Sequence, residues 1–400
     1  MPRASTTLPH RAPIGPLSAL VGALFLAGCS GQGATPGDSG GPNGSAGTTI
    51  VEVTLSADGC PPQPASVPEG PVTVHIKNTD AAAASEVELL QNGAILGEKE
   101  NLVPGLSGTF SLDLKAGQYI LSCPGAKTET ATLTVVAATA GGASPTPISS
   151  TQLAVGAALA RATSGYQAYV RDQVDQLVTA TQALAQAVEA GEVAKAKELY
   201  GPARVFYERI EPVAESFGDL DPKIDGRIDD AASPADFTGF HRLEQALWID
   251  GRTDAMTPIA QGLVTDVQQL QTLVKTASYQ PAQAANGASE LLDEVAASKI
   301  TGEEERYSHL DLLDFQANLD GAQKAFELLQ PALTLIDPDL SSTISARFAD
   351  VQAALAPYQE DGVFVSYTTL TEADTKLLAQ KVDALAEPLS HVAAAVVGHG

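Results

Sequence analysis

A stretch of small residues divides this chain and constrains its fold more than any other feature. From Ala138 to Thr151 almost every residue is Ala, Gly, Ser, Thr or Pro, a composition typical of a linker between domains. Before this stretch, apolar and polar residues alternate over short runs; after it, apolar residues recur at three- and four-residue intervals. A chain of 400 residues can form more than one core. We therefore expect a multidomain protein, with a linker over 138–151 between a β-sandwich at 48–137 and an all-α helical bundle at 152–397.

The strands of the first domain are predicted by alternation and by the turn signals between them. Turns are indicated by Pro68-Glu69-Gly70, Gln91-Asn92-Gly93, Pro104-Gly105 and Ala116-Gly117. Short strands with such regular punctuation are typical of a small β-sandwich. The predicted strands are Thr49–Leu55, Val72–Lys77, Val87–Leu90, Thr109–Leu114, Tyr119–Ser122 and Ala131–Val136.

Helical periodicity, broken by Pro or Gly, continues through the rest of the chain. Short loops between long helices predict antiparallel neighbours packed as a bundle. The predicted helices are Leu153–Ala190, Val193–Phe217 with interruptions at Pro202 and Pro212, a segment opened by Pro234 and Asp236, Pro258–Ala277, Pro281–Ser298, Tyr307–Leu329, Asp339–Pro357 and Thr371–Val397.

The N-terminus has the pattern of an export signal. Arg3 and Arg11 precede an apolar run, Leu17 to Ala27, that is too short to span a bilayer comfortably. The run ends in Leu26-Ala27-Gly28-Cys29, the pattern that the lipoprotein signal peptidase cleaves. We expect a signal peptide at 1–28, a lipidated Cys29 and a flexible tether at 29–47. The protein would then be held at the extracytoplasmic face of the cell membrane; the alternative is a plain signal peptide with an accidental cysteine.

The charge of the chain is strongly negative. Formal charge is −25, and removing residues 1–28 takes away two arginines and no acid, which brings it to about −27. Such a field repels nucleic acid and anionic membrane surfaces and attracts cations. We therefore predict no nucleic-acid partner.

Two cysteines remain if Cys29 carries lipid, and they allow one pairing, Cys60 with Cys123. A blue-copper site needs a histidine, and usually a methionine, shortly after its cysteine, and the residues after Cys123 include neither. Two interpretations stay open: a structural disulfide, or a thiolate and carboxylate metal site completed by Glu86 or Glu88. The disulfide is slightly favoured, because exported thiols tend to oxidise.

The helical part carries three clusters suited to a metal site. His241 and Glu244 lie three apart, so both project from one face of a helix, as do Glu208 and Glu211. The third cluster is Gly302–His309, with three consecutive glutamates. Two of the clusters have an alternative: a surface histidine near a glutamate for His241 and Glu244, and acids favoured by a helix dipole for Gly302–His309.

Several carboxylates with one imidazole suit iron, manganese, zinc or calcium. The sequence has no His-Glu-x-x-His helix, no Gly-x-Ser-x-Gly elbow and no phosphate-binding loop. We therefore predict no catalytic residue and no enzyme activity, with a metallopeptidase as the alternative.

Long stretches of the chain resemble a known family. In the helical part they are residues 207–225, Gly239–Glu244, Ile300–His309 and Asp314–Asn318, and in the sandwich they lie around Asp58-Gly-Cys-Pro-Pro, Glu86-Val-Glu-Leu-Leu, Glu100-Asn-Leu-Val-Pro-Gly and Ser122-Cys-Pro. They are similar to the EfeO family of iron-uptake proteins, which join a cupredoxin-like domain to an imelysin, or peptidase M75-like, domain. The resemblance covers about residues 48–395.

The resemblance implies that the protein binds iron, as Fe2+ or Fe3+, and delivers it to an EfeU-like permease alongside an EfeB-like haem peroxidase. Copper or zinc is a further expectation. Some imelysin-type bundles bind acidic glycans, which gives another alternative. The implied metal ligands are His241, Glu244, Glu208, Glu211, Asp225 and Glu304 (or Glu305) in the bundle, and Cys60, Glu88 and Cys123 in the sandwich.

The lipoprotein pattern before Cys29 departs from the many soluble periplasmic members of the family. It is expected in a cell envelope from which an unanchored protein would be lost.

Overall fold

The computed structural model describes residues 47–137, 149–229, 231 and 233–399. The predicted signal peptide (1–28), Cys29, all of the tether except Gly47, and linker residues 138–148 lie outside the described residues. Within the described ranges, no helix combines the length and the apolar character needed to cross a bilayer.

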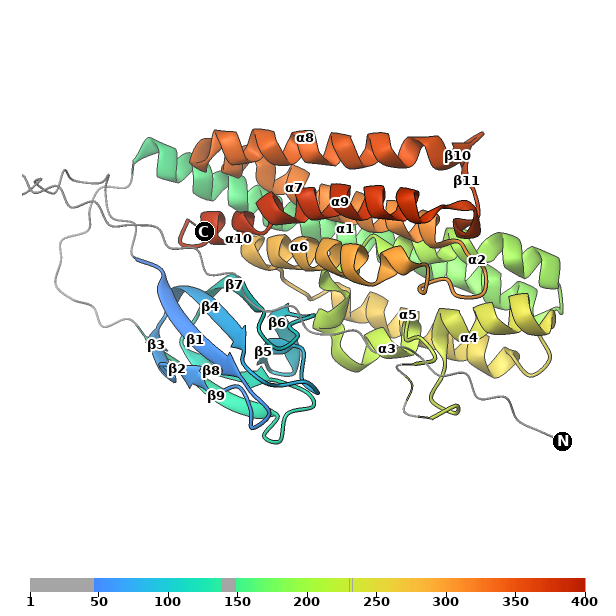
Figure 1. Cartoon of the computed structure of the whole chain (residues 1–400), viewed down its shortest axis with the longest axis horizontal. Coiled ribbons are helices and arrows are strands. Elements are labelled where there is room, and N and C mark those ends of the chain that lie inside the picture. The colour runs from blue at the N-terminus through green and yellow to red at the C-terminus, as the bar shows by residue number, and fades with distance from the viewer. Residues whose placement is uncertain (1–46, 138–148, 230, 232, 400) are drawn as a thin grey trace, which may run out of the picture. The chain divides into compact units, whose positions relative to one another are not determined.

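The first part is a two-sheet β-sandwich, as the alternation predicts (Figure 1). One sheet has the strand order β2-β1-β4-β7 and the other β3-β9-β8-β5-β6. Alternate residues of β1 and β4 are buried between the sheets, which gives the sandwich its apolar core. The strands are β1 (Thr49–Leu55), β2 (Pro62–Gln63), β3 (Ser66–Pro68), β4 (Gly70–Asn78), β5 (Val87–Gln91), β6 (Ala94–Lys99), β7 (Ser107–Leu114), β8 (Gly117–Ser122) and β9 (Thr130–Val136).

Three of these strands were not predicted. β2 and β3 are two and three residues long, too short for an alternation to register. β6 pairs with β5 through a tight turn at Asn92-Gly93, where both residues have positive φ (54° and 82°). Asn-Gly is the preferred pair for such a hairpin, so this turn signal pointed to a second strand.

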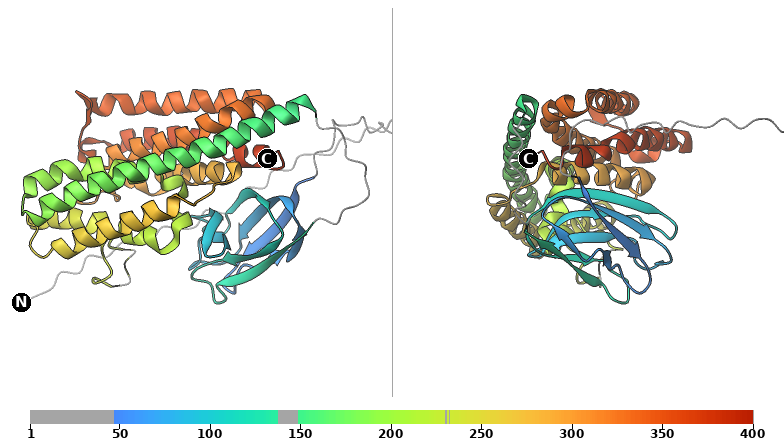
Figure 2. Two further views of the ribbon diagram at one scale, coloured as in Figure 1. Left: turned by 180° about the vertical axis from the view of Figure 1, so that it is seen from behind. Right: turned by 90° about the vertical axis from the view of Figure 1, so that its left-hand side faces the viewer.

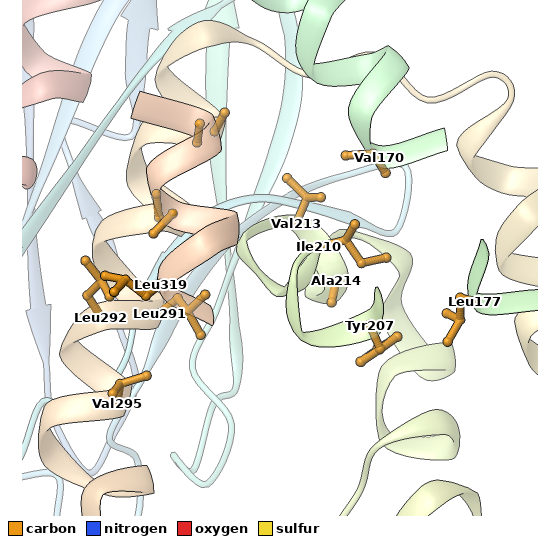
Figure 3. Close-up of a cluster of buried hydrophobic side chains, with 14 of the residues drawn as sticks. Val170, Leu177, Tyr207, Ile210, Val213, Ala214, Leu291, Leu292, Val295 and Leu319 are labelled. Atoms are coloured by element: carbon orange, nitrogen blue, oxygen red, sulfur yellow. The ribbon is translucent and has the colours of Figure 1, made fainter. Parts of the chain in front are cut away.

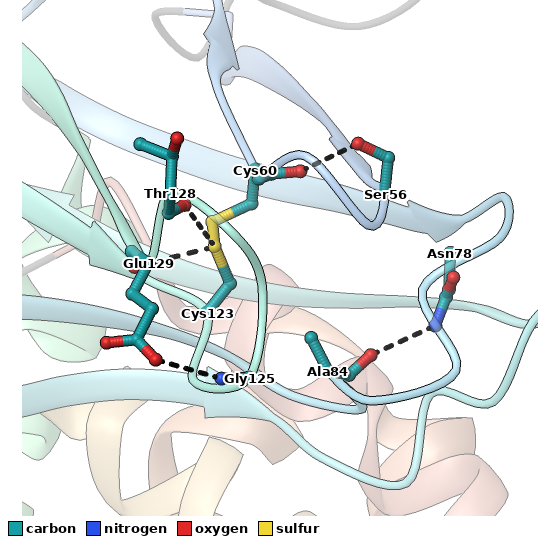
Figure 4. The surroundings of a disulfide bond; sticks show 9 residues. Ser56, Cys60, Asn78, Ala84, Cys123, Gly125, Thr128 and Glu129 are labelled. Carbon is teal, nitrogen blue, oxygen red and sulfur yellow. Dashed lines mark hydrogen bonds between the residues drawn. A yellow bond between two sulfur atoms is a disulfide. The ribbon is translucent and has the colours of Figure 1, made fainter.

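Cys60 and Cys123 form a disulfide (Figure 4). Cys60 follows β1 and Cys123 follows β8, so the bond joins the two sheets. Both residues are fully buried in the sandwich core. This is the interpretation that the sequence slightly favoured, and in this form neither sulfur offers a thiolate to a metal.

The second part is a helical bundle, as predicted. Figures 1 and 2 show its long helices lying side by side, and α1 packs against α2, α5 and α7. The α-helices are α1 (Ser150–Glu189), α2 (Val193–Glu208), α3 (Asp221–Ile224), α4 (Gly239–Gln245), α5 (Thr257–Val274), α6 (Pro281–Ala297), α7 (Asp311–Ile336), α8 (Pro338–Leu355), α9 (Glu372–Leu389) and α10 (His391–Val396). Shorter elements are the 3-10 turns η1 (Glu211–Leu220), η3 (Lys299–Thr301), η4 (Ala356–Tyr358) and η5 (Tyr367–Thr369), the π-helical turn η2 (Ala246–Asp250), and the strands β10 (Gln359–Glu360) and β11 (Val363–Phe364).

Three helix predictions need correction. Pro202 does not interrupt the second helix but lies inside α2, which ends at Glu208, before Pro212. The helix expected from Tyr307 begins only at Asp311, because residues 304–308 form turns and His309 has a positive φ of 59°. The helix expected over Thr371–Val397 is split into α9 and α10.

Apolar side chains from several helices meet in one core. Figure 3 shows Val170 and Leu177 of α1, Tyr207 of α2 and Leu319 of α7 among them. Val213 and Ala214 of η1 belong to the same core, so the irregular segment after α2 is anchored by burial. The position of η1 matters because residues of the candidate site precede it and follow it in the sequence.

The edge of the sandwich contacts α6. The ammonium of Lys99 in β6 donates to Glu290 and Asp293, at 2.7 Å to each. The Asn286 amide donates to the carbonyl of Ser111 in β7 at 2.9 Å. These polar contacts fix β6 and β7 against α6, and Ile95 of β6 and Glu294 of α6 both line the cleft described below.

Candidate metal centre

Gly239 sets the start of the helix that carries the histidine. Its φ is 72°, a left-handed value that favours glycine, and a Cβ there would lie 2.2 Å from the carbonyl oxygen of Ile224. The close approach places α4 directly against the end of α3. His241, two residues later, is 2% exposed, so it is not the surface histidine that was the alternative.

His241 and Glu244 meet as their spacing predicts. The Nδ1 atom of His241 lies 3.2 Å from Oε2 of Glu244. The other carboxylate oxygen, Oε1, accepts hydrogen bonds from the backbone N–H groups of Tyr307 (2.8 Å) and Ser308 (2.7 Å). Glu244 therefore joins α4 to the loop that precedes α7.

That loop and the end of α3 bring further carboxylates to the imidazole. Nε2 of His241 lies 3.6 Å from Oδ1 of Asp225 and 3.7 Å from Oε1 of Glu304. On the other side of the ring, Nδ1 lies 3.9 Å from Oε1 of Glu305. Two triads result, Asp225–His241–Glu304 and His241–Glu244–Glu305, each with its candidate ligand atoms within 4.8 Å of one another. We call these five residues the inner group.

Arg204 fills the space beside the inner group. It is fully buried on α2, and its guanidinium contacts Glu208, Asp225 and Glu305. Nε also lies 3.2 Å from Oδ2 of Asp314 in α7. Glu208, expected as a direct neighbour of the imidazole, thus faces this arginine.

Lys299 is a second buried cation near the site. Its ammonium contacts Glu211 and lies 3.8 Å from Glu294 and 3.9 Å from both Glu208 and Glu304. We call these four acids the outer group; Glu304 belongs to both groups. The predicted ligands of the bundle are therefore divided: Glu211 lies in the outer group, while Asp225, His241 and Glu244 lie in the inner one.

Electrostatics keep the imidazole charged. Burial and the charge of Arg204 lower the pKa of His241, but hydrogen bonds with Glu244 and Glu304 outweigh them and raise it to about 9. Burial raises the pKa of Asp225 to about 6, although Arg204 opposes the shift. At neutral pH the imidazolium proton therefore occupies the place that a metal ion would take.

The glutamates of the inner group are shifted in opposite directions. Burial raises the pKa of Glu304, but Lys299 and His241 together hold it well below its usual value. Burial likewise disfavours ionised Glu244, yet its bond to His241 and two backbone N–H groups lower its pKa. For Glu305 burial wins over Arg204, so its pKa is raised well above the usual value. Such divergence among adjacent acids is typical of functional sites.

A cleft of about 840 Å3 reaches the site from the surface. Nine carboxylates line it against two basic groups, Lys299 and Arg227, so it attracts cations. Carboxylates come from both domains: Glu86, Glu88 and Glu100 from the sandwich, and Glu211, Asp219, Asp221, Asp225, Glu294 and Glu304 from the bundle.

The sandwich contributes Glu88 to this cleft. Glu88 lies on β5, opposite Ser122 of β8, the residue before Cys123. Its neighbour Glu86 has a raised pKa, first through burial and then through the charge of Glu88. The two cysteines expected beside Glu88 are joined as the disulfide and do not line the cleft, and the charged residues that line it from this side are all carboxylates.

Sequence reasoning missed the two basic residues. Arg204 lies four residues from both Tyr200 and Glu208, on the buried stripe of α2, and this spacing was the available signal. Lys299, after the end of α6, follows no such pattern. In the third cluster, Glu304 and Glu305 point inward, and they lie seven and six residues before α7, too far for its dipole to explain them.

Comparison with known proteins finds a family match for each domain. The imelysin family model matches residues 162–392 and the cupredoxin-like domain model matches residues 18–135. The chain is 42% identical over 347 residues to the "Iron uptake system component EfeO" of Escherichia coli (strain K12), covering 86% of this chain and 90% of that protein. The proteins of that name from Shigella flexneri and Shigella sonnei (strain Ss046) give the same identity and coverage.

The fold and the two family matches define a two-domain protein, in which a cupredoxin-like sandwich precedes an imelysin domain with a buried carboxylate–histidine group. The chain belongs to the EfeO family.

Proposed function

We propose that this protein is the extracytoplasmic metal-binding component of an Efe-type iron uptake system. It captures iron at the inner group and passes it to a membrane permease. The observation that carries this proposal is the convergence of one imidazole and four carboxylates from three separate segments, with their ligand atoms within 4.8 Å in each triad. The name of the related E. coli protein, an iron uptake system component, supports the same function.

The donor set suits iron as cargo. Carboxylate oxygens and one imidazole nitrogen are hard and borderline ligands, which bind Fe2+ and Fe3+ well and discriminate against soft Cu(I). Asp225, His241 and Glu304 would provide ligands on the cleft side, because Asp225 and Glu304 line the cleft. A site that opens into an acidic cleft allows both capture and release.

The N-terminal pattern supports a place for the protein at the cell membrane. We propose that Cys29 carries the lipid that holds the protein at the outer face of the cell membrane, next to an EfeU-like permease and an EfeB-like haem peroxidase. Cys29→Ser should then release the protein from the membrane fraction. Retention of this variant in that fraction would contradict lipid anchoring through Cys29.

Anaerobic titration with Fe2+ tests the site itself. The double variant His241→Ala, Glu244→Ala removes two groups of the inner group, and it should lose the Fe2+ equivalent that the wild-type protein binds. The matched control is His391→Ala, Glu387→Ala, which removes a histidine and a glutamate from the exposed surface of the bundle. This control should bind as the wild type does. Unchanged Fe2+ binding by the first variant would contradict the site.

Two other functions have less support. Peptide hydrolysis requires a polypeptide to reach the metal, and Glu244 is fully buried while His241 is 2% exposed. An acidic glycan would meet nine carboxylates in the cleft unless cations bridged them. Metal-dependent cleavage of a peptide library above a chelated control, or metal-independent binding of an alginate-like polymer, would favour these functions instead.

A further inference from the structure

Lys299 lines both the open cleft and a second, smaller cavity. It begins η3, just after α6, and its side chain is 7% exposed. Glu304 also lines both the cleft and the smaller cavity, which has a volume of about 10 Å3. Asp311 and Asp314 line that cavity from α7. Lys299 thus stands where an ion entering from the cleft would approach the buried acids.

The ammonium of Lys299 lies in the outer group as a metal ion would. All four carboxylates of that group, Glu208, Glu211, Glu294 and Glu304, approach its Nζ within 3.9 Å. The Asn318 amide of α7 donates to Glu208 at 2.9 Å and to Glu211 at 2.5 Å, which holds two of these carboxylates in position. A protein cation therefore occupies an ordered ring of acids.

One oxygen atom connects this lysine to the inner group. Oε1 of Glu304 lies 3.9 Å from Nζ of Lys299 and 3.7 Å from Nε2 of His241. An ion held by Asp225, His241 and Glu304 would share that oxygen with the ammonium. Two positive charges at such separations repel each other strongly when the surroundings are buried.

Arg204 and Lys299 differ in how easily their side chains can move from the buried acids into water. Arg204 is fully buried on α2 among Glu208 of the same helix and carboxylates from three other segments, and it lines neither the cleft nor the small cavity. Lys299 already borders the cleft, and a lysine has a long flexible stem and a strongly hydrated ammonium. Lys299 can therefore reach water by rotating its side chain, whereas Arg204 cannot without opening the bundle.

We propose that Lys299 is an exchangeable internal cation, which neutralises the outer group in the empty protein and moves into the cleft when a metal ion binds. The proposal rests on the proposed function, because the arriving ion is the iron. Glu304, which belongs to both groups, then has a cation beside it in both states, which avoids the penalty of an uncompensated charge at that carboxylate. The ammonium of Lys299 therefore competes with the metal ion for the carboxylates of the outer group.

Amine labelling of the wild-type protein tests the movement directly. The purified protein is treated with an acetylating reagent, without metal and with saturating Fe2+ under anaerobic conditions, and labelling is read for each lysine by peptide mass spectrometry. The exposed Lys376 of α9 is the internal reference. Labelling of Lys299 should rise at least several-fold with Fe2+, while that of Lys376 stays constant. Unchanged or decreased labelling of Lys299 would overturn the exchange.

A variant tests the competition. Lys299→Met keeps the length of the stem and removes the charge, so Fe2+ affinity should rise about tenfold or a second Fe2+ equivalent should appear. Lys299→Arg keeps the charge and should bind no more tightly than wild type. A folded Lys299→Met protein, verified by circular dichroism, with unchanged or weaker affinity would overturn the proposal, since a purely structural lysine gives that result.

The same measurements separate this inference from the function on which it rests. If the wild-type protein binds no Fe2+, the proposed function fails and the exchange fails with it. If Fe2+ binds and is lost in the His241→Ala, Glu244→Ala variant, the function stands. Constant labelling of Lys299 would then refute the exchange alone.

Discussion

The interiors of the two domains differ in the charge of their buried polar side chains. Among the described residues, the buried polar side chains of the sandwich are uncharged, Asn78 and Ser111, whereas those of the bundle include Arg204, Lys299 and six acids. Asn78 donates to the carbonyls of Ala81, Ala84 and Leu102 and so holds a loop (Figure 4 shows the Ala84 contact). The sandwich adds a disulfide to an apolar core; the bundle buries a charge network.

The difference indicates where selection for function outweighs selection for stability. Burying paired charges is often no better for stability than burying apolar groups, while removing one partner from such a network is costly. The network around Arg204 and His241 therefore points to a function, whereas the interior of the sandwich is explained by folding alone. The predictions below test this contrast, beginning with the largest expected effect.

Arg204→Met should have the largest effect on stability. It leaves Glu208, Asp225 and Glu305 without their shared counter-charge, and we expect a loss of about 3–5 kcal/mol in the free energy of unfolding, measured by urea denaturation. Arg347→Met, which removes an exposed arginine paired with Asp350, should change it by less than about 0.5 kcal/mol. A similarly small change in the free energy of unfolding for both variants would mean that the buried network stabilises the fold no more than an exposed ion pair does.

Removing the disulfide should weaken the sandwich and spare the bundle. Cys60→Ala with Cys123→Ala opens a covalent loop with a sequence separation of 63 residues, and loss of such a bond costs about 2–4 kcal/mol. Hydrogen exchange should quicken in β1 and β8, whereas Fe2+ binding at the inner group persists. Loss of Fe2+ binding in this variant would show that the sandwich does more than line the cleft.

Gly239→Ala should disturb the bundle at its site. The added Cβ meets the Ile224 carbonyl at 2.2 Å in a backbone with φ of 72°, so we expect a loss of about 1–3 kcal/mol and weaker metal binding through displacement of His241. Gly262→Ala in α5 is the control, because nothing lies within 4 Å of its Cβ and alanine favours helices. Equal behaviour of the two variants in thermal unfolding would contradict the close approach.

Metal affinity should increase with pH. The pKa of His241 is raised to about 9, so the empty protein holds a proton there that the metal must displace. Affinity for Mn2+, measured calorimetrically, should rise about tenfold per pH unit from pH about 6.5 until it levels near pH 9. The stabilising effect of this imidazolium has the opposite sign: it is complete below pH about 6.5 and is lost as pH rises towards 9. A flat affinity profile would contradict the charged imidazole.

The smallest effect is expected at the histidine–carboxylate pair His75–Glu52 of the sandwich. His75 lies 3.3 Å from Glu52 on the surface of the first sheet, with both side chains well exposed. His75→Ala should change the free energy of unfolding by less than about 0.5 kcal/mol and leave Fe2+ binding unchanged. A loss of Fe2+ binding would place a functional site on this face and erase the contrast between the domains.

Local periodicity predicted most of the elements because it records which face of each segment is buried. Strand β1 was predicted to the residue, and α6 to within one residue. Strands β2 and β3 were not predicted because two or three residues show no periodicity. Helix α7 begins later than predicted because Glu304 and Glu305 of the preceding turns face inward, where they contact distant helices. The pairing of His241 with Glu244 was predictable because spacing on one helix fixes it.

By itself, the sequence determined the change from strands to helices at the linker and the side-chain face shared by His241 and Glu244. It favoured a disulfide between Cys60 and Cys123, which the structure shows. Only the tertiary structure decided that Asp225 and Glu304 reach that imidazole, and that Arg204 and Lys299 are the charges that balance the acids. The physical reason is that a charged side chain is normally expected at the surface. Whether it can be buried depends on partners from other segments, and no local pattern records them.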